Sequence, residues 1–162
     1  MSNFSKELAN IMKSFLDSYD LKYDFDEDNG TFTFALGLSG KIKRVIFYVM
    51  VGQNSYNVVG FLDNPDFDGK QIPAISEFLH RINCLCHESR FEFDTDGKTI
   101  ACTQCINCKG ITPNKELILY TFSDIVFCIK WYGDGLVDVI EGRETPKEIC
   151  DNYEKELLSW IT

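Results

Sequence analysis

The chain has 162 residues and a formal net charge of −9, with 44% hydrophobic and 14% aromatic residues. This composition is too apolar for a disordered chain and suits one domain with a buried core. The negative charge repels phosphate groups, so we expect neither nucleic acid nor an anionic membrane surface as a partner.

No targeting or membrane segment is predicted. Lys6, Glu7, Lys13 and Asp17 interrupt the apolar positions of the first 20 residues, where a signal peptide needs a continuous apolar core. No window reaches the roughly 18 apolar residues of a membrane span. We therefore expect a cytoplasmic protein.

The seven cysteines, an odd number, are expected to be reduced thiols and not a disulfide framework.

The N-terminal part is predicted to form one helix and four antiparallel strands. Apolar residues recur at spacings of three and four over 3–19, which indicates an amphipathic helix. The spacing changes to two near Tyr23, and Asn29-Gly30 predicts a hairpin turn. Three further strands are expected, the last two at 43–51 and 56–62, and short strands joined by tight turns are typical of a meander.

A helix followed by a hairpin is predicted next. Pro73 is suited to a first helical turn, and the apolar stripe continues to about His87. Phe91 and Phe93 alternate with acidic residues, so both are expected to pack inward against this helix. Asp96-Gly97 predicts the turn into a return strand over 98–106.

Two helices are predicted at the C-terminal end. Thr112-Pro113 is expected to open a long apolar helix that reaches about Glu141, with Gly133 and Gly135 kinking or shortening it. Thr145-Pro-Lys-Glu148 is a capping box for a final helix over 146–161, whose apolar stripe includes Ile161. The whole order is α-β-β-β-β-α-β-β-α-α, which predicts a single α+β domain over 1–162 with helices packed on an antiparallel sheet.

The segment 72–142 resembles the YbjN-like family of bacterial proteins. The matching features are an apolar helix ending in Arg81-Ile-Asn83, the run Arg90-Phe-Glu-Phe-Asp94, the turn Asp96-Gly97, and a polar loop into a long helix ending near Val139-Ile-Glu-Gly142. The preceding helix and four strands agree in order. The resemblance implies a fold similar to that of type III secretion chaperones, and a small, acidic, dimeric protein that binds other proteins without a cofactor. The cysteine-rich strand is a departure from the family pattern.

The sharpest chemical pattern is Cys102-x-x-Cys105-x-x-Cys108, with Cys84-x-Cys86 upstream. Thiolates at such spacing can bind zinc or an iron–sulfur cluster. However, an offset of three on a strand puts Cys102 and Cys105 on opposite faces. We therefore expect these cysteines to serve as small buried residues and predict no metal ligand.

Two weaker patterns are interpreted as structural. Asn64-x-Asp66-x-Asp68-Gly69 mimics the start of a calcium loop, but the twelfth position is Ile75 and not a glutamate. His80 and His87 lie seven apart on the predicted helix and are expected at the rim of the core.

No nucleophile elbow, phosphate-binding loop, dinucleotide motif or zinc-protease motif is present. We therefore assign no catalytic, cofactor-binding or metal-binding residue. The leading hypothesis is a non-enzymatic module, chaperone-like or regulatory, that binds a protein or peptide. The alternative is a thiol-based metal or redox sensor that uses Cys102, Cys105 and Cys108.

We also predict a homodimer, because the long helix is apolar on more than one side. The competing explanation is that the final helix covers the surplus apolar surface of the long helix.

Overall fold

The computed structural model describes residues 3–63 and 66–160, which form a six-stranded antiparallel sheet and four helices. The observed order of elements confirms the predicted one. The elements are α1 (Lys6–Asp17), β1 (Asp24–Asp26), β2 (Thr31–Gly37), β3 (Arg44–Val51), β4 (Ser55–Leu62), α2 (Ile72–Asn83), β5 (Arg90–Asp94), β6 (Thr99–Asn107), α3 (Lys115–Ile140) and α4 (Pro146–Ser159).

The strands lie in the order β1-β2-β3-β4-β6-β5. The first four form the predicted meander, in which each strand pairs with the next along the chain. The hairpin of β5 and β6 then adds to it, because β6 pairs with β4. The short β1 pairs only with Thr31–Thr33, so the rest of β2 has a strand neighbour on one side only.

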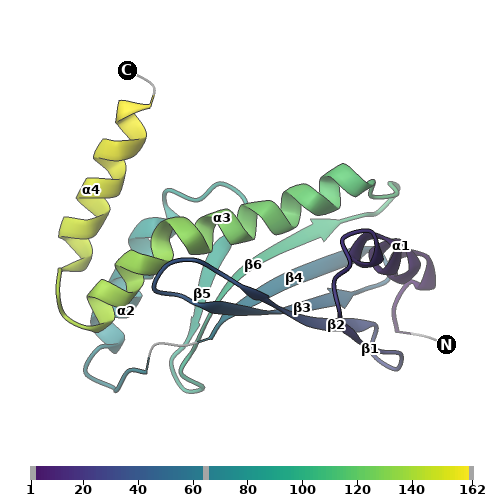
Figure 1. Cartoon of the computed structure of the whole chain (residues 1–162), viewed down its shortest axis with the longest axis horizontal. Helices are drawn as coiled ribbons and strands as arrows, with labels where there is room; N and C mark the ends of the chain where they lie inside the picture. Colours follow the sequence, from purple (N-terminus) through teal and green to yellow (C-terminus); the bar gives the residue numbers. More distant parts are fainter. Residues whose placement is uncertain (1–2, 64–65, 161–162) are drawn as a thin grey trace.

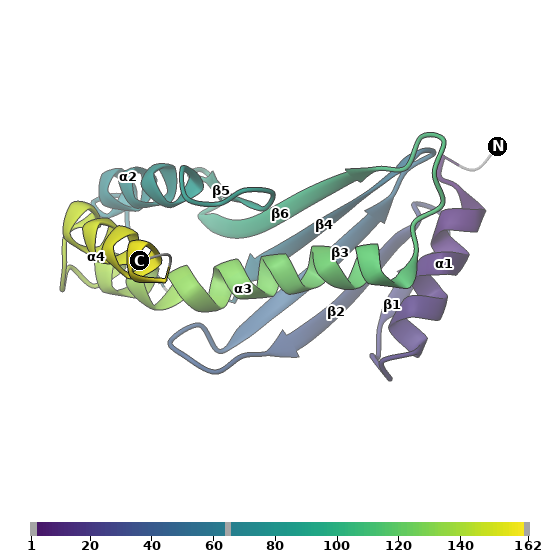
Figure 2. The ribbon, with the colours of Figure 1, turned by 90° about the horizontal axis from the view of Figure 1, so that it is seen from above.

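Helices α1 and α3 lie on one face of this sheet, and α4 packs on the other helices beyond the end of the sheet, as Figures 1 and 2 show. In β3, Val45, Phe47 and Val49 are fully buried, whereas Tyr48 and Met50 on the other face are 38% and 41% exposed. This period of two is the direct consequence of a pleated strand with one covered face. Seen from above, α3 runs across the strands, with α1 at one end and α2 and α4 at the other (Figure 2).

The long helix α3 continues from Lys115 to Ile140, so the expected early end at Gly133 and Gly135 is wrong. Both glycines are buried where another segment approaches the helix closely. A Cβ at Gly133 would lie 2.9 Å from Ile42 Cγ1, and a Cβ at Gly135 would lie 2.9 Å from Ile149 Cγ2 of α4. The glycines therefore serve packing and not the ending of the helix.

Two helix boundaries differ from those predicted. Asn114, and not Thr112, caps α3, because its side chain accepts a hydrogen bond from the Leu117 N–H at 2.9 Å. Helix α2 ends at Asn83, before His87. The capping box of Thr145 at the start of α4 is confirmed, with the Thr145 N–H donating to Glu148 at 3.0 Å. Ile161, placed in the stripe of the final helix, lies outside the described residues.

The hairpin side chains are arranged only partly as expected. Phe91 is 5% exposed, and its backbone exchanges two hydrogen bonds with the Asn83 side chain at the end of α2. Phe93 is only half-buried and packs against Phe67, with ring centroids 5.6 Å apart. Phe91 is therefore the core residue of β5, and Phe93 lies at the border of the core.

Candidate protein-binding groove

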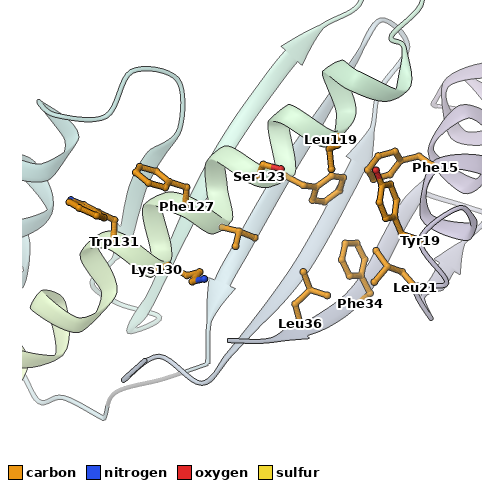
Figure 3. A pocket seen from close by; sticks show the side chains of 12 residues that line it. Phe15, Tyr19, Leu21, Phe34, Leu36, Leu119, Ser123, Phe127, Lys130 and Trp131 are labelled. Carbon is orange, nitrogen blue, oxygen red and sulfur yellow. The ribbon is translucent and has the colours of Figure 1, made fainter. Parts of the chain in front are cut away.

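An apolar groove of about 740 Å³ lies between α1, β2 and α3. It lies between α1 and α3 where both helices rest on the sheet, and Leu36 near the end of β2 is only half-buried there (Figures 2 and 3). We call this the α1–β2–α3 groove. Its lining consists of Phe15, Tyr19, Leu21, Phe34, Leu36, Leu119, Phe122, Ser123, Val126, Phe127, Lys130 and Trp131.

The inner wall of the groove is a packed aromatic cluster. The Phe122 ring lies 5.6 Å from Phe15 in a stacked pair, 5.8 Å from Phe34 and 5.6 Å from Phe47, measured between centroids. All four side chains are buried. Aromatic pairs at these separations are favourable beyond their buried area. The groove is therefore a preformed surface on the core and not a space between loops.

The outer wall exposes large apolar side chains of α3. Leu119 is 40% exposed and Phe127 is 48% exposed, and Tyr19 at the α1 end is 42% exposed. Helix α4 does not cover them, since its ring contacts with α3 are at Trp131 and Tyr132, toward the C-terminal end of α3. The final helix thus covers only part of the surplus apolar surface of α3. Contiguous exposed apolar surface usually marks an association site.

The charges at the groove are positive, in contrast to the acidic chain as a whole. Among the described residues that line it, Lys130 is the one charged side chain, and no carboxylate there pairs with it. On the α1 side, Lys115 Nζ lies 4.6 Å from the centroid of the Tyr19 ring. The groove therefore combines apolar walls with one lysine in its lining and a second, Lys115, beside Tyr19.

The structure separates the three cysteines of the predicted thiol motif. Cys102 is buried on the helix-covered face of β6, whereas Cys105 is exposed, so the expected opposite orientation is confirmed. Cys108 is buried just beyond the strand, where burial raises the pKa of its thiol. The described residues contain no group of three or more His, Cys, Asp and Glu side chains placed to hold a metal ion.

A different set of thiols comes together in the core. Cys86 Sγ, just after α2, lies 3.9 Å from Cys128 Sγ of α3, and Cys102 of β6 interacts with Cys128 as well. The contact with Cys128, together with burial, raises the pKa of Cys86. The hydrogen bond with Cys102, together with burial, raises the pKa of Cys128 to about 12. The thiols of Cys86 and Cys128 therefore ionise less readily than an ordinary cysteine and are weak nucleophiles and ligands.

The other predicted patterns remain structural. His80 on α2 and His87 beyond it are both exposed, and they do not share one helix. Asn64 lies outside the described residues, and the Asp68 carboxylate accepts a hydrogen bond from the Lys70 N–H at 2.7 Å within its own turn.

One buried polar pair was not anticipated. Ser89 is fully buried and donates from its hydroxyl to Asp124 of α3, while its N–H donates to the same carboxylate at 3.1 Å. Within the described residues, Ser89 forms hydrogen bonds with Asp124 and Gln104 but with no histidine that could act as a base. The pair therefore links the hairpin to α3. The sequence carries no signal for it, because Ser89 and Asp124 lie 35 residues apart.

Together these features define an α+β protein with helices on one face of an antiparallel sheet and an apolar groove between them. No protein-family model matches the sequence, and no curated protein is significantly similar to it. Among solved structures, the chain is similar to YbjN from E. coli, described as a proposed transcription regulator. The TM-score is 0.55 over 77% of this chain and 90% of the YbjN chain, at 9% sequence identity. The chain therefore has a YbjN-like fold, as its sequence indicated.

Within the parts of the chain that the structure describes, no helix combines the length and the apolar character needed to cross a bilayer.

Proposed function

We propose that this protein is a non-enzymatic module that binds another protein through the α1–β2–α3 groove. The observation that carries the proposal is the exposure of Leu119 and Phe127 beside a preformed apolar hollow of about 740 Å³. Burying such side chains on association is favourable by about 25 cal/mol per Å² of apolar surface removed from water. A partner that covers the groove would gain this energy with little rearrangement of the groove itself.

A regulatory role acting through protein contact fits this proposal. The YbjN structure with the same fold is described as a proposed transcription regulator. A net charge of −9 disfavours direct contact with the phosphate backbone of DNA, which basic side chains normally make. We therefore place any regulatory activity in the capture of a protein and not in the recognition of nucleic acid.

Affinity capture with a groove-filling variant tests the proposal. Ser123 is exposed on the groove wall, so Ser123→Trp fills the groove without removing a core side chain. Met50→Trp is the matched control, because Met50 is 41% exposed on the opposite face of the sheet. Both variants should unfold in urea at the wild-type midpoint.

We expect proteins retained from native lysate by the wild type and by Met50→Trp to be lost from Ser123→Trp. An identical set of retained proteins for all three baits would contradict a binding role of the groove.

The thiol-sensor alternative is disfavoured by the separation of its three cysteines, because Cys102 and Cys108 are buried whereas Cys105 is exposed on the other face of β6. Ellman's reagent should label Cys84 and Cys105 rapidly in the native protein, because these two thiols are exposed. Cys102, Cys108 and Cys128 should react only after unfolding. Rapid native labelling of Cys102 or Cys108 would revive the alternative, as would one equivalent of zinc or iron in protein purified under reducing, anaerobic conditions.

A further inference from the structure

We propose that the occupant of the α1–β2–α3 groove is an amphipathic helix of a partner protein that carries an acidic residue for Lys130. This inference rests on the proposed protein-binding function and specifies the partner's shape and charge. Three properties of the groove lead to it, namely its length, the polarity of its walls and the sign of its charges.

The length fits a short helix. The α3 wall runs from Leu119 to Trp131, thirteen residues of helix, whose Cα atoms span about 18 Å along the axis at 1.5 Å per residue. A partner helix of about three turns has the same length, and its apolar residues at i, i+3, i+4 and i+7 form a stripe on one side. The groove is floored by a sheet and walled by helices, so a helix laid in it would pack on the same kinds of surface that α3 does.

The wall chemistry favours a helix over an extended peptide. Nearly all the lining groups are apolar side chains, with Ser123, Lys130 and the Tyr19 hydroxyl as the polar exceptions. An extended segment could pair with the free edge of β2 beyond Thr33. That edge is four residues long, so most of the segment's other backbone N–H and C=O groups would face apolar walls without partners, which costs free energy when they are buried. A helix satisfies its own backbone and presents only side chains to the walls.

The positive charge at the groove favours a partner segment with a negative charge. Lys130 lies on the α3 wall and forms no ion pair within the described structure, and Lys115 lies beside Tyr19 at the α1 side of the groove. A basic helix would place like charges side by side, which disfavours binding, whereas a carboxylate beside the apolar stripe would pair with Lys130. Two copies joined groove to groove would supply lysines and no carboxylate to each other's lining, so charge disfavours that arrangement.

Selection from a random 16-residue peptide library displayed on phage, with the wild-type protein as bait, tests the inference. Enriched sequences should show the helical apolar stripe with Asp or Glu beside it. The best peptide is then synthesised with a fluorescein label, and its affinity is measured by anisotropy for the wild type, Lys130→Glu and Lys109→Glu. Lys109 is exposed in the loop before α3, outside the groove, so its reversal changes the net charge equally.

Lys130→Glu should weaken the best peptide about 5-fold to 30-fold, since an attraction is replaced by a repulsion. Lys109→Glu should change its affinity less than about twofold. Replacing the acidic residue of the peptide by lysine should restore binding to Lys130→Glu.

The outcomes separate the two proposals. One outcome is a set of peptides that bind the wild type but not Ser123→Trp, and that either carry no preferred acidic residue or bind Lys130→Glu as well as the wild type. This outcome would overturn the acidic helix and leave the proposed function of the groove intact. Failure to enrich any peptide that Ser123→Trp rejects would overturn both. Self-association that Ser123→Trp abolishes would identify a second copy as the occupant and would also overturn the acidic helix of a partner.

Discussion

Replacing Gly135 by alanine should destabilise the protein, although alanine is the better residue for a helix. Gly135 is buried in α3 where α4 packs against it. A Cβ at this position would lie 2.5 Å from the Tyr153 hydroxyl oxygen and 2.9 Å from Ile149 Cγ2. Burial raises the pKa of Tyr153 to about 12, so the hydroxyl is neutral, and it forms a hydrogen bond with the Gly135 backbone.

Three contributions decide the size of the effect. Alanine gains about 1 kcal/mol over glycine in a helix interior. Overpacking costs about 1–3 kcal/mol, because α4 must move until the new carbon reaches the usual contact distance of roughly 3.5 Å or more. Loss of the Tyr153 hydrogen bond adds about 1 kcal/mol. The net expectation is a loss of about 1–3 kcal/mol in the free energy of unfolding.

Urea unfolding followed by tryptophan fluorescence measures this difference, and Tyr153→Phe provides the internal test. In that background the closest clashing atom is absent, so Gly135→Ala should cost at least about 1 kcal/mol less than it does alone. Gly37→Ala is the control, since no atom lies within 4 Å of a Cβ there and its stability should change by less than about 1 kcal/mol. If Gly135→Ala is as stable as the wild type, or if its cost is the same in both backgrounds, the assigned packing of α4 on α3 is wrong.

Phe91→Ala should lower the free energy of unfolding by about 3–5 kcal/mol, because Phe91 is buried, and Phe93→Ala should lower it by about 1–2 kcal/mol, because Phe93 is half-buried. Equal losses for the two variants in urea unfolding would contradict this ranking. Burial opposes ionisation of Asp138, but pairing with Lys41 and Arg143 outweighs it and keeps the pKa of this carboxyl below its usual value. The ion pairs of Asp138 therefore stabilise the fold fully at pH values above the pKa of this carboxyl in the unfolded chain. Their contribution is lost as the pH falls through its lower pKa in the folded protein. Asp138→Asn should lower the free energy of unfolding by about 1–2 kcal/mol at pH 7 and by almost nothing at pH 2. A difference between variant and wild type that stays constant over this pH range would show that the ion pairs contribute nothing. The homodimer stays a prediction: light scattering over a tenfold dilution should give twice the chain mass, and a constant 18.6 kDa would exclude it.

Much of the fold could be predicted because its signals are local. The alternation Phe91, Glu92, Phe93 and the capping box at Thr145 each depend on a few adjacent residues, and both elements exist. Errors arose where tertiary contacts decide. Gly133 and Gly135 were expected to kink or shorten α3, but their effect depends on Ile42 and α4, which lie far away in sequence.

The candidate site could not be predicted in the same way. The regular spacing of Cys102, Cys105 and Cys108 drew attention to one strand, whereas the thiols in contact are Cys86 and Cys128, from segments 42 residues apart. The α1–β2–α3 groove has no linear signature either, since Phe15, Phe34 and Phe122 read as ordinary core residues of three separate elements.

The sequence by itself determined the order of elements, the inward side of Phe91 in β5 and the acidic net charge, because hydrophobic period, turn residues and charge act over short distances. The tertiary structure alone decided that α1 and α3 leave Leu36 near the end of β2 half-buried and that Lys130 lines the groove (Figure 3). Both features depend on the position of the helices on the sheet. That position is set by the packing of side chains that are distant in the chain. At Gly60 in β4, for example, a Cβ would lie 3.3 Å from Ile125 of α3, so the helix approaches the strand closely there.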